Sequence, residues 1–303
     1  MKFSVIIPAY NAQACIGRSI ESVLNQTCSD WELIVVNNGS NDGTLSEIGR
    51  YSAKDRRIKV INCPRNSGSP ARPRNLGLRE AQGEYVAFLD ADDTFLPDKL
   101  SEVRDFFADN PDIGLVCHGE EHIKGNAVIR RDYYGPYTTY EDLLFKGNSL
   151  STSAIIMKRE CVEKTGFFSE GSEFGGFEDY DYWLRAAKVC RIGYFRKVLG
   201  TYLVSESGES SRIAVNCRNA LLFLDKQFRE YGKGSLYYAL LMRKRKALCL
   251  RSAGRECMKM RDYKSAVPLL FKGIAHNPLD LKQLAFLLMA LPAAVFRRAD
   301  TYV

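Results

Sequence analysis

The sequence predicts an α/β fold, in which a mixed, mainly parallel sheet is flanked by helices and followed by a helical C-terminal extension. Two patterns indicate this fold. Short apolar runs alternate with helical periodicity over the first 120 residues, whereas only helical periodicity remains after residue 213. The chain has 303 residues, which is enough for one large domain and a smaller appendage.

The expected strands of the first part are short apolar runs bounded by turn residues. They cover residues 3–7, 31–36, 58–63, 85–90 and 113–119. The helices expected between them carry apolar residues three and four positions apart, and they cover residues 12–26, 44–52, 73–81 and 97–107. Pro73 suits the first turn of its helix, where its missing N–H is not needed. Because strands alternate with helices, the strands should run mostly parallel.

The later part of the chain passes from a mixed pattern to a helical one. Residues 120–150 are less regular, and they are followed by an expected strand at 153–157, a helix at 178–189 and a strand at 192–204. Helical periodicity then predicts four consecutive helices, at 213–231, 235–259, 263–275 and 279–298. The sheet is therefore expected to end before the C-terminal third of the chain.

Three carboxylates stand at the end of the fourth expected strand, where Leu89 leads into Asp90, Ala91, Asp92 and Asp93. Burying unpaired carboxylates is unfavourable and clustering them is worse, so a divalent cation is the usual partner of such a group. Ligands bind at the carboxyl ends of strands in open α/β sheets, which makes this segment a candidate metal site. A solvated acidic turn before the next helix is the alternative.

The ends of the other strands carry groups that suit a nucleoside diphosphate. Tyr10 offers an aromatic face after the first strand, Asn38 offers hydrogen-bonding groups for a base after the second, and Arg74 offers a guanidinium for phosphate at the start of the third helix. Taken singly, these residues do not require a nucleotide site, since Asn38 can belong to a plain turn and Arg74 can be a surface residue. Their occurrence in this order favours one nucleotide-binding crevice.

Five motifs in this order resemble those of the family-two glycosyltransferases, which have the Rossmann-like GT-A fold. The motifs are Ser4–Asn11, Ser22–Thr27, Asn37–Thr44, Arg74–Gly77 and Phe88–Asp93. The resemblance is close over residues 3–110 and looser to about residue 210. It implies a catalytic domain at 1–210, with a nucleotide-binding half at 1–110 and an acceptor-binding half at 111–210, and it does not cover the helical region 211–303.

The resemblance also implies the residues that carry the chemistry. The segment Gly175–Arg185 resembles the family's Glu-Asp motif, so Asp179 would be the catalytic base and Glu178 would position the acceptor or the donor. Helix capping by acidic side chains is the alternative for this pair. Asp92 would hold Mg²⁺ or Mn²⁺ against the donor diphosphate. The residues implied to bind the nucleotide or the donor are Pro8, Tyr10, Asn38, Arg74, Asp90 and Asp93.

The expected activity is that of an inverting glycosyltransferase. It would move a sugar from a nucleoside-diphosphate sugar, with UDP the favoured nucleotide, to a hydroxyl of a surface-polysaccharide or glycolipid precursor by single displacement. Two other interpretations remain: a protein that binds nucleotide-sugar without catalysis, and a nucleotidyltransferase. The second is disfavoured because Tyr10–Gly17 lacks the lysine of a phosphate-binding loop.

Two segments depart from the family pattern. The pair Asn37–Asn38 replaces the usual aspartates of the second strand's turn, although an asparagine still offers both a donor and an acceptor to a base. The segment Tyr202–Ser207 lacks the histidine that helps to hold metal or diphosphate in many relatives, and Glu206 is a candidate replacement. His118 and His122 are expected to be structural or to lie on the acceptor side.

Positive charge is concentrated in the C-terminal part of the chain. Residues 196–303 contain 20 Lys and Arg but 8 Asp and Glu, whereas the whole chain has a net charge of +7. The apolar helix expected at Leu279–Arg298 and the basic cluster Arg243–Lys246 predict peripheral contact with the inner membrane face, near a lipid-linked glycan acceptor. The alternative is a helix packed on the catalytic domain or on a second copy of the chain.

Other sequence features limit the cellular location and the kinds of partner that we expect. No apolar segment reaches the roughly 20 residues needed to cross a bilayer, and no secretory signal is evident. The nine cysteines are scattered without a CxxC pair, which suits reduced thiols and a cytoplasmic location. Nucleic acid is not expected as a partner, because no strand combines basic and aromatic residues for base stacking.

Overall fold

The structure is a computed structural model, and it describes residues 2–125, 127–171, 175–204, 213–231 and 234–296. The chain forms two compact units. The first comprises Met1–Leu143, Asn148–Ser172 and Glu178–Ser205, and the second comprises Leu144–Gly147, Glu173–Phe177 and Glu206–Val303.

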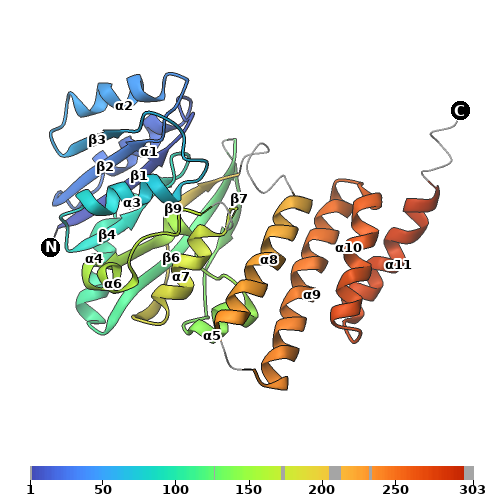
Figure 1. The fold of residues 1–303 in the computed structure, drawn as a ribbon. Coiled ribbons are helices and arrows are strands. Elements are labelled where there is room, and N and C mark those ends of the chain that lie inside the picture. The colour runs from blue at the N-terminus through green and yellow to red at the C-terminus, as the bar shows by residue number, and fades with distance from the viewer. Residues whose placement is uncertain (1, 126, 172–174, 205–212, 232–233, 297–303) are drawn as a thin grey trace, which may run out of the picture. The chain divides into compact units, whose positions relative to one another are not determined.

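The first unit is built on a sheet that has nine strands among the described residues (Figure 1). The strands are β1 (Phe3–Ala9), β2 (Trp31–Asn37), β3 (Ile58–Asn62), β4 (Tyr85–Phe88), β5 (Thr94–Phe95), β6 (Ile113–Lys124), β7 (Ala127–Asp132), β8 (Ile155–Lys158) and β9 (Arg191–Leu203). The helices are α1 (Ile16–Leu24), α2 (Thr44–Ser52), α3 (Ala71–Glu80), α4 (Lys99–Asp109), α5 (Tyr140–Lys146), α6 (Arg159–Thr165) and α7 (Glu178–Ala186), and a 3₁₀ turn, η1, covers Thr152–Ala154. The last residues of α5 belong to the second unit.

The strand order is β3-β2-β1-β4-β8-β6-β9-β5, and β7 pairs with β6. Four pairings are parallel, namely β2–β3, β1–β2, β1–β4 and β6–β9. The strand β8 lies between β4 and β6 and runs antiparallel to both. The predicted mixed sheet with flanking helices is therefore confirmed. The direction of β8 had no local signal, because a short strand buried on both faces is apolar whichever way it runs.

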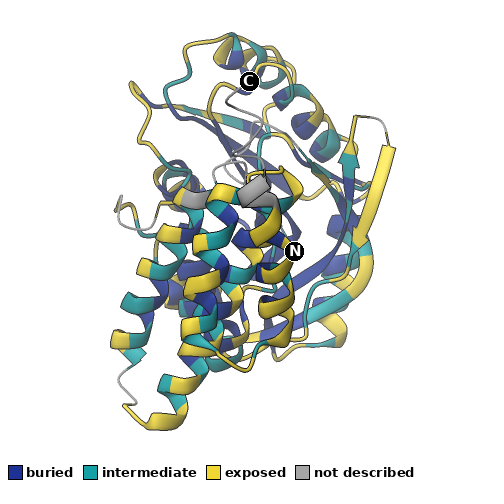
Figure 2. Cartoon of the chain, turned by 90° about the vertical axis from the view of Figure 1, so that its right-hand side faces the viewer, coloured by how far each residue is buried: buried dark blue, intermediate teal, exposed yellow. Residues whose placement is uncertain are grey.

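The core of the first unit lies around the parallel strands. Every residue of β1 and of β2 is buried, which explains why both strands are mostly apolar, whereas most of β7 is exposed (Figure 2). The buried Ser4 of β1 and Glu32 of β2 are exceptions, and the hydroxyl of Ser4 donates to Oε1 of Glu32 at 2.7 Å. The helix α3 approaches β1 closely at Gly77, where an added Cβ would lie 2.4 Å from Cγ2 of Ile6. This packing places α3 directly against β1.

Two predicted boundaries differ from the structure near those strand ends. The fourth strand ends at Phe88 rather than at residue 90, because a turn begins at Asp90, whose carbonyl accepts from the N–H of Asp93 at 3.1 Å. The first helix begins at Ile16 rather than at residue 12, and the N–H of Ala12 donates to Oγ1 of Thr44 at 2.8 Å, which ties the segment before the helix to α2. A local turn thus ends the strand, and a tertiary hydrogen bond holds the segment before the helix.

The second unit contains the predicted C-terminal helices. They are α8 (Ile213–Tyr231), α9 (Leu236–Lys259), α10 (Tyr263–His276) and α11 (Leu281–Phe296). The side chains of Ser235 and Asp262 cap α9 and α10 by accepting from backbone N–H groups. At Gly254 an added Cβ would lie 2.7 Å from Cγ of Leu270, so α9 and α10 pack closely. Within the described residues, none of the helices has the length and apolar character needed to span a membrane.

Candidate active site

The acidic segment after β4 is anchored by Asp93, which is buried. Its Oδ2 accepts from the hydroxyl of Ser153 at 2.6 Å, and its Oδ1 accepts from the N–H of Leu203 at 2.9 Å. Burial raises the pKa of Asp93 well above its usual value, and the charges of Asp90 and Asp92 raise it further. Asp93 therefore ties the acidic segment to η1 and to the end of β9.

Asp92 faces solvent at the same segment. Its carboxylate accepts no hydrogen bond from another residue in the described part of the chain. Partial withdrawal from water raises the pKa of Asp92, and the negative charge of Asp90 raises it further. A carboxylate in this electrostatic setting is stabilised by any cation that binds beside it.

Arg74 joins the two acidic motifs of the sequence. Its guanidinium is buried, and its Nη2 lies 2.6 Å from Oδ1 of Asp90 while its Nη1 lies 3.9 Å from Oε1 of Glu178. Burial alone would lower the pKa of Arg74, but the charges of Asp90, Glu178 and Asp179 outweigh it and raise the pKa. The structure thus directs this guanidinium toward carboxylates, and its contact with a phosphate stays a prediction.

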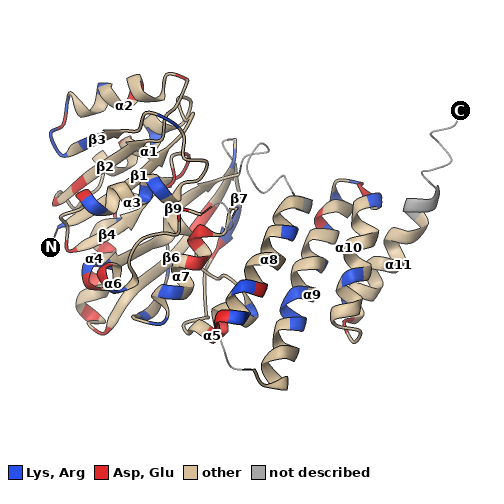
Figure 3. Cartoon of the chain, in the orientation of Figure 1, with Lys and Arg blue, Asp and Glu red and all other residues tan. Residues whose placement is uncertain are grey.

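The first turn of α7 carries Glu178, which is buried, and Asp179, which is partly buried; Figure 3 shows the acidic start of this helix. Oδ1 of Asp179 accepts from the N–H of Tyr180 at 2.6 Å, and its Oδ2 accepts from the hydroxyl of Thr152 at 3.4 Å. Burial raises the pKa of Asp179, and the charge of Asp90 adds to the rise against the opposing effect of Arg74. A raised pKa makes this carboxylate a stronger proton acceptor.

The turn η1 contacts both acidic motifs, which the sequence reasoning missed. Besides its bond to Asp93, Oγ of Ser153 accepts from the N–H of Asp90 at 3.1 Å. The carbonyl of Ser153 accepts from Nζ of Lys99 at 2.6 Å. Thr152, the preceding residue, donates to Asp179. The available signal was a run of small hydroxyl residues directly before an apolar strand, which alone does not distinguish a functional turn from a surface one.

Lys99 is fully buried beneath this turn. Its Nζ also lies 3.4 Å from the centre of the Phe95 ring. Burial lowers the pKa of Lys99 to about 7, against the opposing charges of Glu120, Cys117 and Asp93. A lysine at the start of a helix normally faces water, so nothing in the sequence indicated this burial.

Three of the residues predicted to bind the nucleotide or the donor, Pro8, Tyr10 and Asn38, lie near the ends of β1 and β2. Pro8 is buried within β1, and Tyr10, just beyond it, is 46% exposed. The N–H of Asn38 donates to the carbonyl of Ala9 at 2.7 Å, so the two strand ends are adjacent. The side chain of Asn38 is engaged by the loop before α3, because its amide donates to Oδ1 of Asn66 at 3.0 Å. Its contact with a base therefore stays a prediction.

The two histidines of β6 have partners within the first unit. His118 is fully buried, and its Nδ1 lies 2.8 Å from the carbonyl of Gly119. Burial and the charge of Lys99 lower the pKa of His118 well below its usual value. Nε2 of His122 lies 3.0 Å from Oδ2 of Asp132. Glu206, the candidate replacement for the family's histidine, lies outside the described residues.

The described residues contain no group of three or more His, Cys, Asp and Glu side chains arranged to hold a metal ion. A metal site formed by protein ligands alone is thus not present in the described part of the chain. Mg²⁺, however, is commonly bound by one or two carboxylates together with the phosphates of a substrate. Asp92 and Asp90 offer two carboxylates in one short segment, and their binding of a metal ion stays a prediction.

Comparisons with known proteins identify the family to which this chain is related. Residues 4–166 match the family described as Glycosyl transferase family 2. The chain is 31% identical over 210 residues to the UDP-Glc:alpha-D-GlcNAc-diphosphoundecaprenol beta-1,3-glucosyltransferase WfgD of Escherichia coli, covering 69% of this chain and 79% of that protein. Neither the non-catalytic interpretation nor the nucleotidyltransferase is favoured by these matches.

Two solved structures have the same fold. TarS 1-349 of S. aureus, in complex with UDP-GlcNAc, aligns with a TM-score of 0.59 and 20% identity over 96% of this chain and 80% of that one. The mannosyltransferase PcManGT of Pyrobaculum calidifontis, in complex with GDP-Man and Mn²⁺, aligns with a TM-score of 0.59 and 20% identity over 100% of this chain and 88% of that one. Together with the family match, they show that this chain belongs to glycosyltransferase family 2 and is a glycosyltransferase with the GT-A fold.

Proposed function

We propose that the protein is an inverting glycosyltransferase that uses a UDP-sugar and a hydroxyl acceptor on a polysaccharide or lipid-linked glycan precursor. The observation that carries this proposal is the meeting of the two acidic motifs at Arg74, which lies between Asp90 and Glu178. The relative from Escherichia coli supports the choice of substrates, since its name specifies a UDP-glucose donor and a diphosphoundecaprenol-linked acceptor.

In this proposal Asp179 is the catalytic base. Its carboxylate takes the proton of the acceptor hydroxyl while the hydroxyl oxygen forms a bond to the anomeric carbon of the donor. The bond from that carbon to the nucleoside diphosphate breaks, and the leaving group keeps the electron pair. Because attack and departure occur on opposite faces, the anomeric configuration inverts. The raised pKa of Asp179 supports this role.

The acidic segment suits Mg²⁺ or Mn²⁺, with Asp92 as the main protein ligand and Asp90 beside it. The carboxylate of Asp92 is exposed and its pKa is raised in part by Asp90, so a cation at this position relieves an existing repulsion. When bound, such a cation neutralises the charge that develops on the departing diphosphate. The chain's own contribution is to hold the segment in place through Asp93 and Ser153.

The remaining predicted residues are proposed to shape the donor site. Tyr10 is exposed enough to stack on a base, Pro8 lies opposite Val36 of β2, and the N–H of Asn38 bonds to the carbonyl of Ala9 between the two strand ends. Asp90 is proposed to meet the ribose or a metal-bound water, and Asp93 to support the donor sugar or acceptor side. Residues 1–110 would form the nucleotide half of a catalytic domain that ends near residue 210.

We also propose a cytoplasmic location with peripheral contact to the inner membrane face. The supporting observation is α11, whose side chains Leu284, Leu288 and Leu291 are exposed by 40% or more. Exposed apolar residues on a helix, in a region rich in Lys and Arg, suit an interfacial position. Equal sedimentation of the full-length chain and a 1–278 truncation with anionic vesicles would contradict this location.

The activity is tested by nucleotide release from a panel of UDP-, GDP- and dTDP-sugars with Mn²⁺. We expect release from one donor class, with a loss of at least about 100-fold in Asp179→Asn and a comparable loss in Asp92→Ala. The matched control is Asp98→Asn, which removes an exposed carboxylate from the start of α4 and should leave turnover unchanged. Full activity in Asp179→Asn would overturn its role as base. Calorimetric binding of the same donors separates an enzyme that lacks its acceptor from one that binds no donor.

A further inference from the structure

Lys99, the first residue of α4, is a buried cation to which the proposed mechanism gives no role. Its side chain is fully buried, and its Nζ donates to the carbonyl of Ser153 in η1 at 2.6 Å. The ring of Phe95 lies beside the same ammonium. Taking a lysine out of water is costly, and an apolar side chain of similar size would avoid that cost. Stability alone therefore does not explain this residue.

Glu120 on β6 is the carboxylate that balances the charge of Lys99. Its side chain is fully buried, and its charge is the largest of those that oppose the effect of burial on the pKa of Lys99. Oε2 of Glu120 also accepts from the hydroxyl of Tyr134 at 2.6 Å. His118, two residues away on the same strand, is buried with its pKa well below its usual value, so it stays neutral and adds no competing positive charge. Lys99 is thus held as a charged group inside the first unit.

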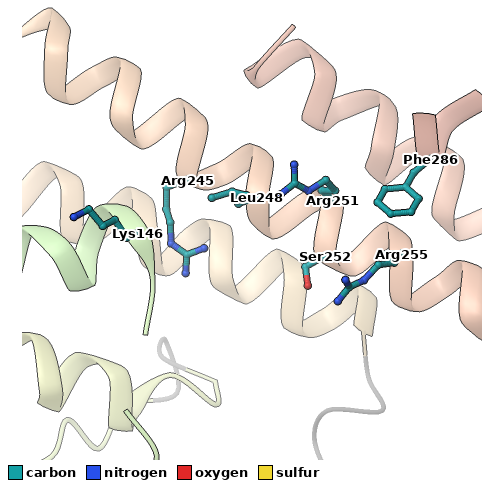
Figure 4. A pocket seen from close by; sticks show the side chains of 7 residues that line it. All are labelled: Lys146, Arg245, Leu248, Arg251, Ser252, Arg255 and Phe286. Atoms are coloured by element: carbon teal, nitrogen blue, oxygen red, sulfur yellow. The ribbon is translucent and has the colours of Figure 1, made fainter. Parts of the chain in front are cut away.

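Two cations of the second unit differ from Lys99 in their surroundings. Figure 4 shows the hollow beside α9, which Arg251 and Arg255 line. Nη1 of Arg251 lies 2.7 Å from Oδ1 of Asp280, and Nη2 of Arg255 lies 3.3 Å from Oε1 of Glu256. Both arginines are partly or fully exposed to water and each is paired with a carboxylate, so their placement needs no further explanation.

The turn that Lys99 binds, η1, contacts both acidic motifs. The hydroxyl of Ser153 donates to Asp93 at 2.6 Å, and the hydroxyl of Thr152 donates to Asp179 at 3.4 Å. Because Nζ of Lys99 binds the carbonyl of Ser153, a single contact restrains the backbone that carries both hydroxyls. A displacement of about 1 Å in a catalytic group can lower turnover by roughly 100-fold, so this restraint matters for the reaction.

We propose that Lys99 is a positioning residue for sugar transfer. Its ammonium fixes η1, and η1 in turn orients Asp179 and the acidic segment toward the substrates. Lys99 itself contacts no substrate, and Glu120 supplies the counter-charge that allows an ammonium to stay in this buried place. The inference rests on the proposed function, because it takes Asp179 as the base.

Lys99→Met tests this role in the full-length chain, because it removes the ammonium and keeps an unbranched side chain. The matched control is Lys158→Met, at the opposite end of β8 from η1. Lys158 also donates to a backbone carbonyl, that of Pro111, and its Nζ lies 5.4 Å from the centre of the Phe107 ring. We expect nucleotide release by Lys99→Met to fall roughly 10–100-fold, with the control near the wild type.

The pH profile separates positioning from a purely structural role. If η1 shifts, Thr152 no longer stabilises the charged form of Asp179, so the acid limb of the kcat profile should move to higher pH in Lys99→Met. Loss of stability alone would lower Tm and leave this limb in place. Lys99→Met/Glu120→Gln removes the carboxylate that the single variant leaves unbalanced, so it should recover Tm but not turnover.

The outcomes distinguish this inference from the proposed function. Wild-type turnover with an unchanged acid limb in Lys99→Met would overturn the inference, and so would recovery of turnover together with Tm in the double variant. Both results leave the proposed function intact, because the wild type is active in each. Absence of nucleotide release from the wild type with every donor would instead contradict the proposed function, and the inference would fall with it.

Discussion

Replacing Ser153 by alanine should destabilise the first unit by about 2 kcal/mol. The hydroxyl of Ser153 makes two hydrogen bonds, donating to Asp93 at 2.6 Å and accepting from the N–H of Asp90 at 3.1 Å. A bond to a charged group contributes roughly 1.5–3 kcal/mol, and a buried N–H without a partner adds a further penalty. We take the lower part of this range, because burial raises the pKa of Asp93 and so disfavours its charged form.

Thermal unfolding followed by circular dichroism measures this effect. In a unit of about 200 residues, 1 kcal/mol corresponds to roughly 2–4 °C in Tm, so the expected drop is roughly 4–8 °C. The matched control is Ser101→Ala on α4, whose hydroxyl bonds at the surface to the carbonyl of Asp98 and to the hydroxyl of Thr27. Its loss should change the stability by less than about 0.5 kcal/mol.

A double-mutant cycle with Asp93→Asn isolates the contact between the two side chains. The destabilisations by Ser153→Ala and Asp93→Asn should not add, and the difference should be roughly 0.5–3 kcal/mol. Additive effects, or equal Tm values for Ser153→Ala and Ser101→Ala, would show that Ser153 does not anchor the acidic segment.

Two other predictions concern the proton acceptor and the close approach of α3 to β1. Turnover should fall in acid as Asp179 becomes protonated, at a pH above the ordinary carboxyl value of 3.8 because burial raises its pKa. Thr152→Val removes a hydrogen bond that stabilises the charged form of Asp179, so the acid limb of the pH profile of kcat should move to higher pH. An acid limb at the same pH in the variant would show that this hydrogen bond does not affect the pKa of Asp179. Gly77→Ala should lower the free energy of unfolding by roughly 1–3 kcal/mol, because its Cβ would meet Ile6 at 2.4 Å. Gly49 is a helical glycine with open space around it, so Gly49→Ala should instead raise the free energy of unfolding by roughly 0.5–1 kcal/mol. Urea titrations measure both changes, and a change of the same sign in the two variants would contradict the packing argument.

The sequence by itself determined the parts of the fold that depend on local patterns. The strands β1 and β2 were predictable because burial on both faces favours a mostly apolar run. The helices α8 to α11 were predictable because each shows helical periodicity between turn residues. The acidic segment at Asp90 could be identified as a candidate site because clustered carboxylates directly after a buried strand are unfavourable without a binding partner.

Only the tertiary structure decided which side chains meet. Arg74 is 16 residues from Asp90 and 104 residues from Glu178, and no local pattern relates such positions. The burial of Lys99 and the role of Ser153 likewise depend on how η1 packs beneath the acidic segment. Side-chain partners at these separations are set by the packing of whole elements, because local preferences specify an element but not its neighbours.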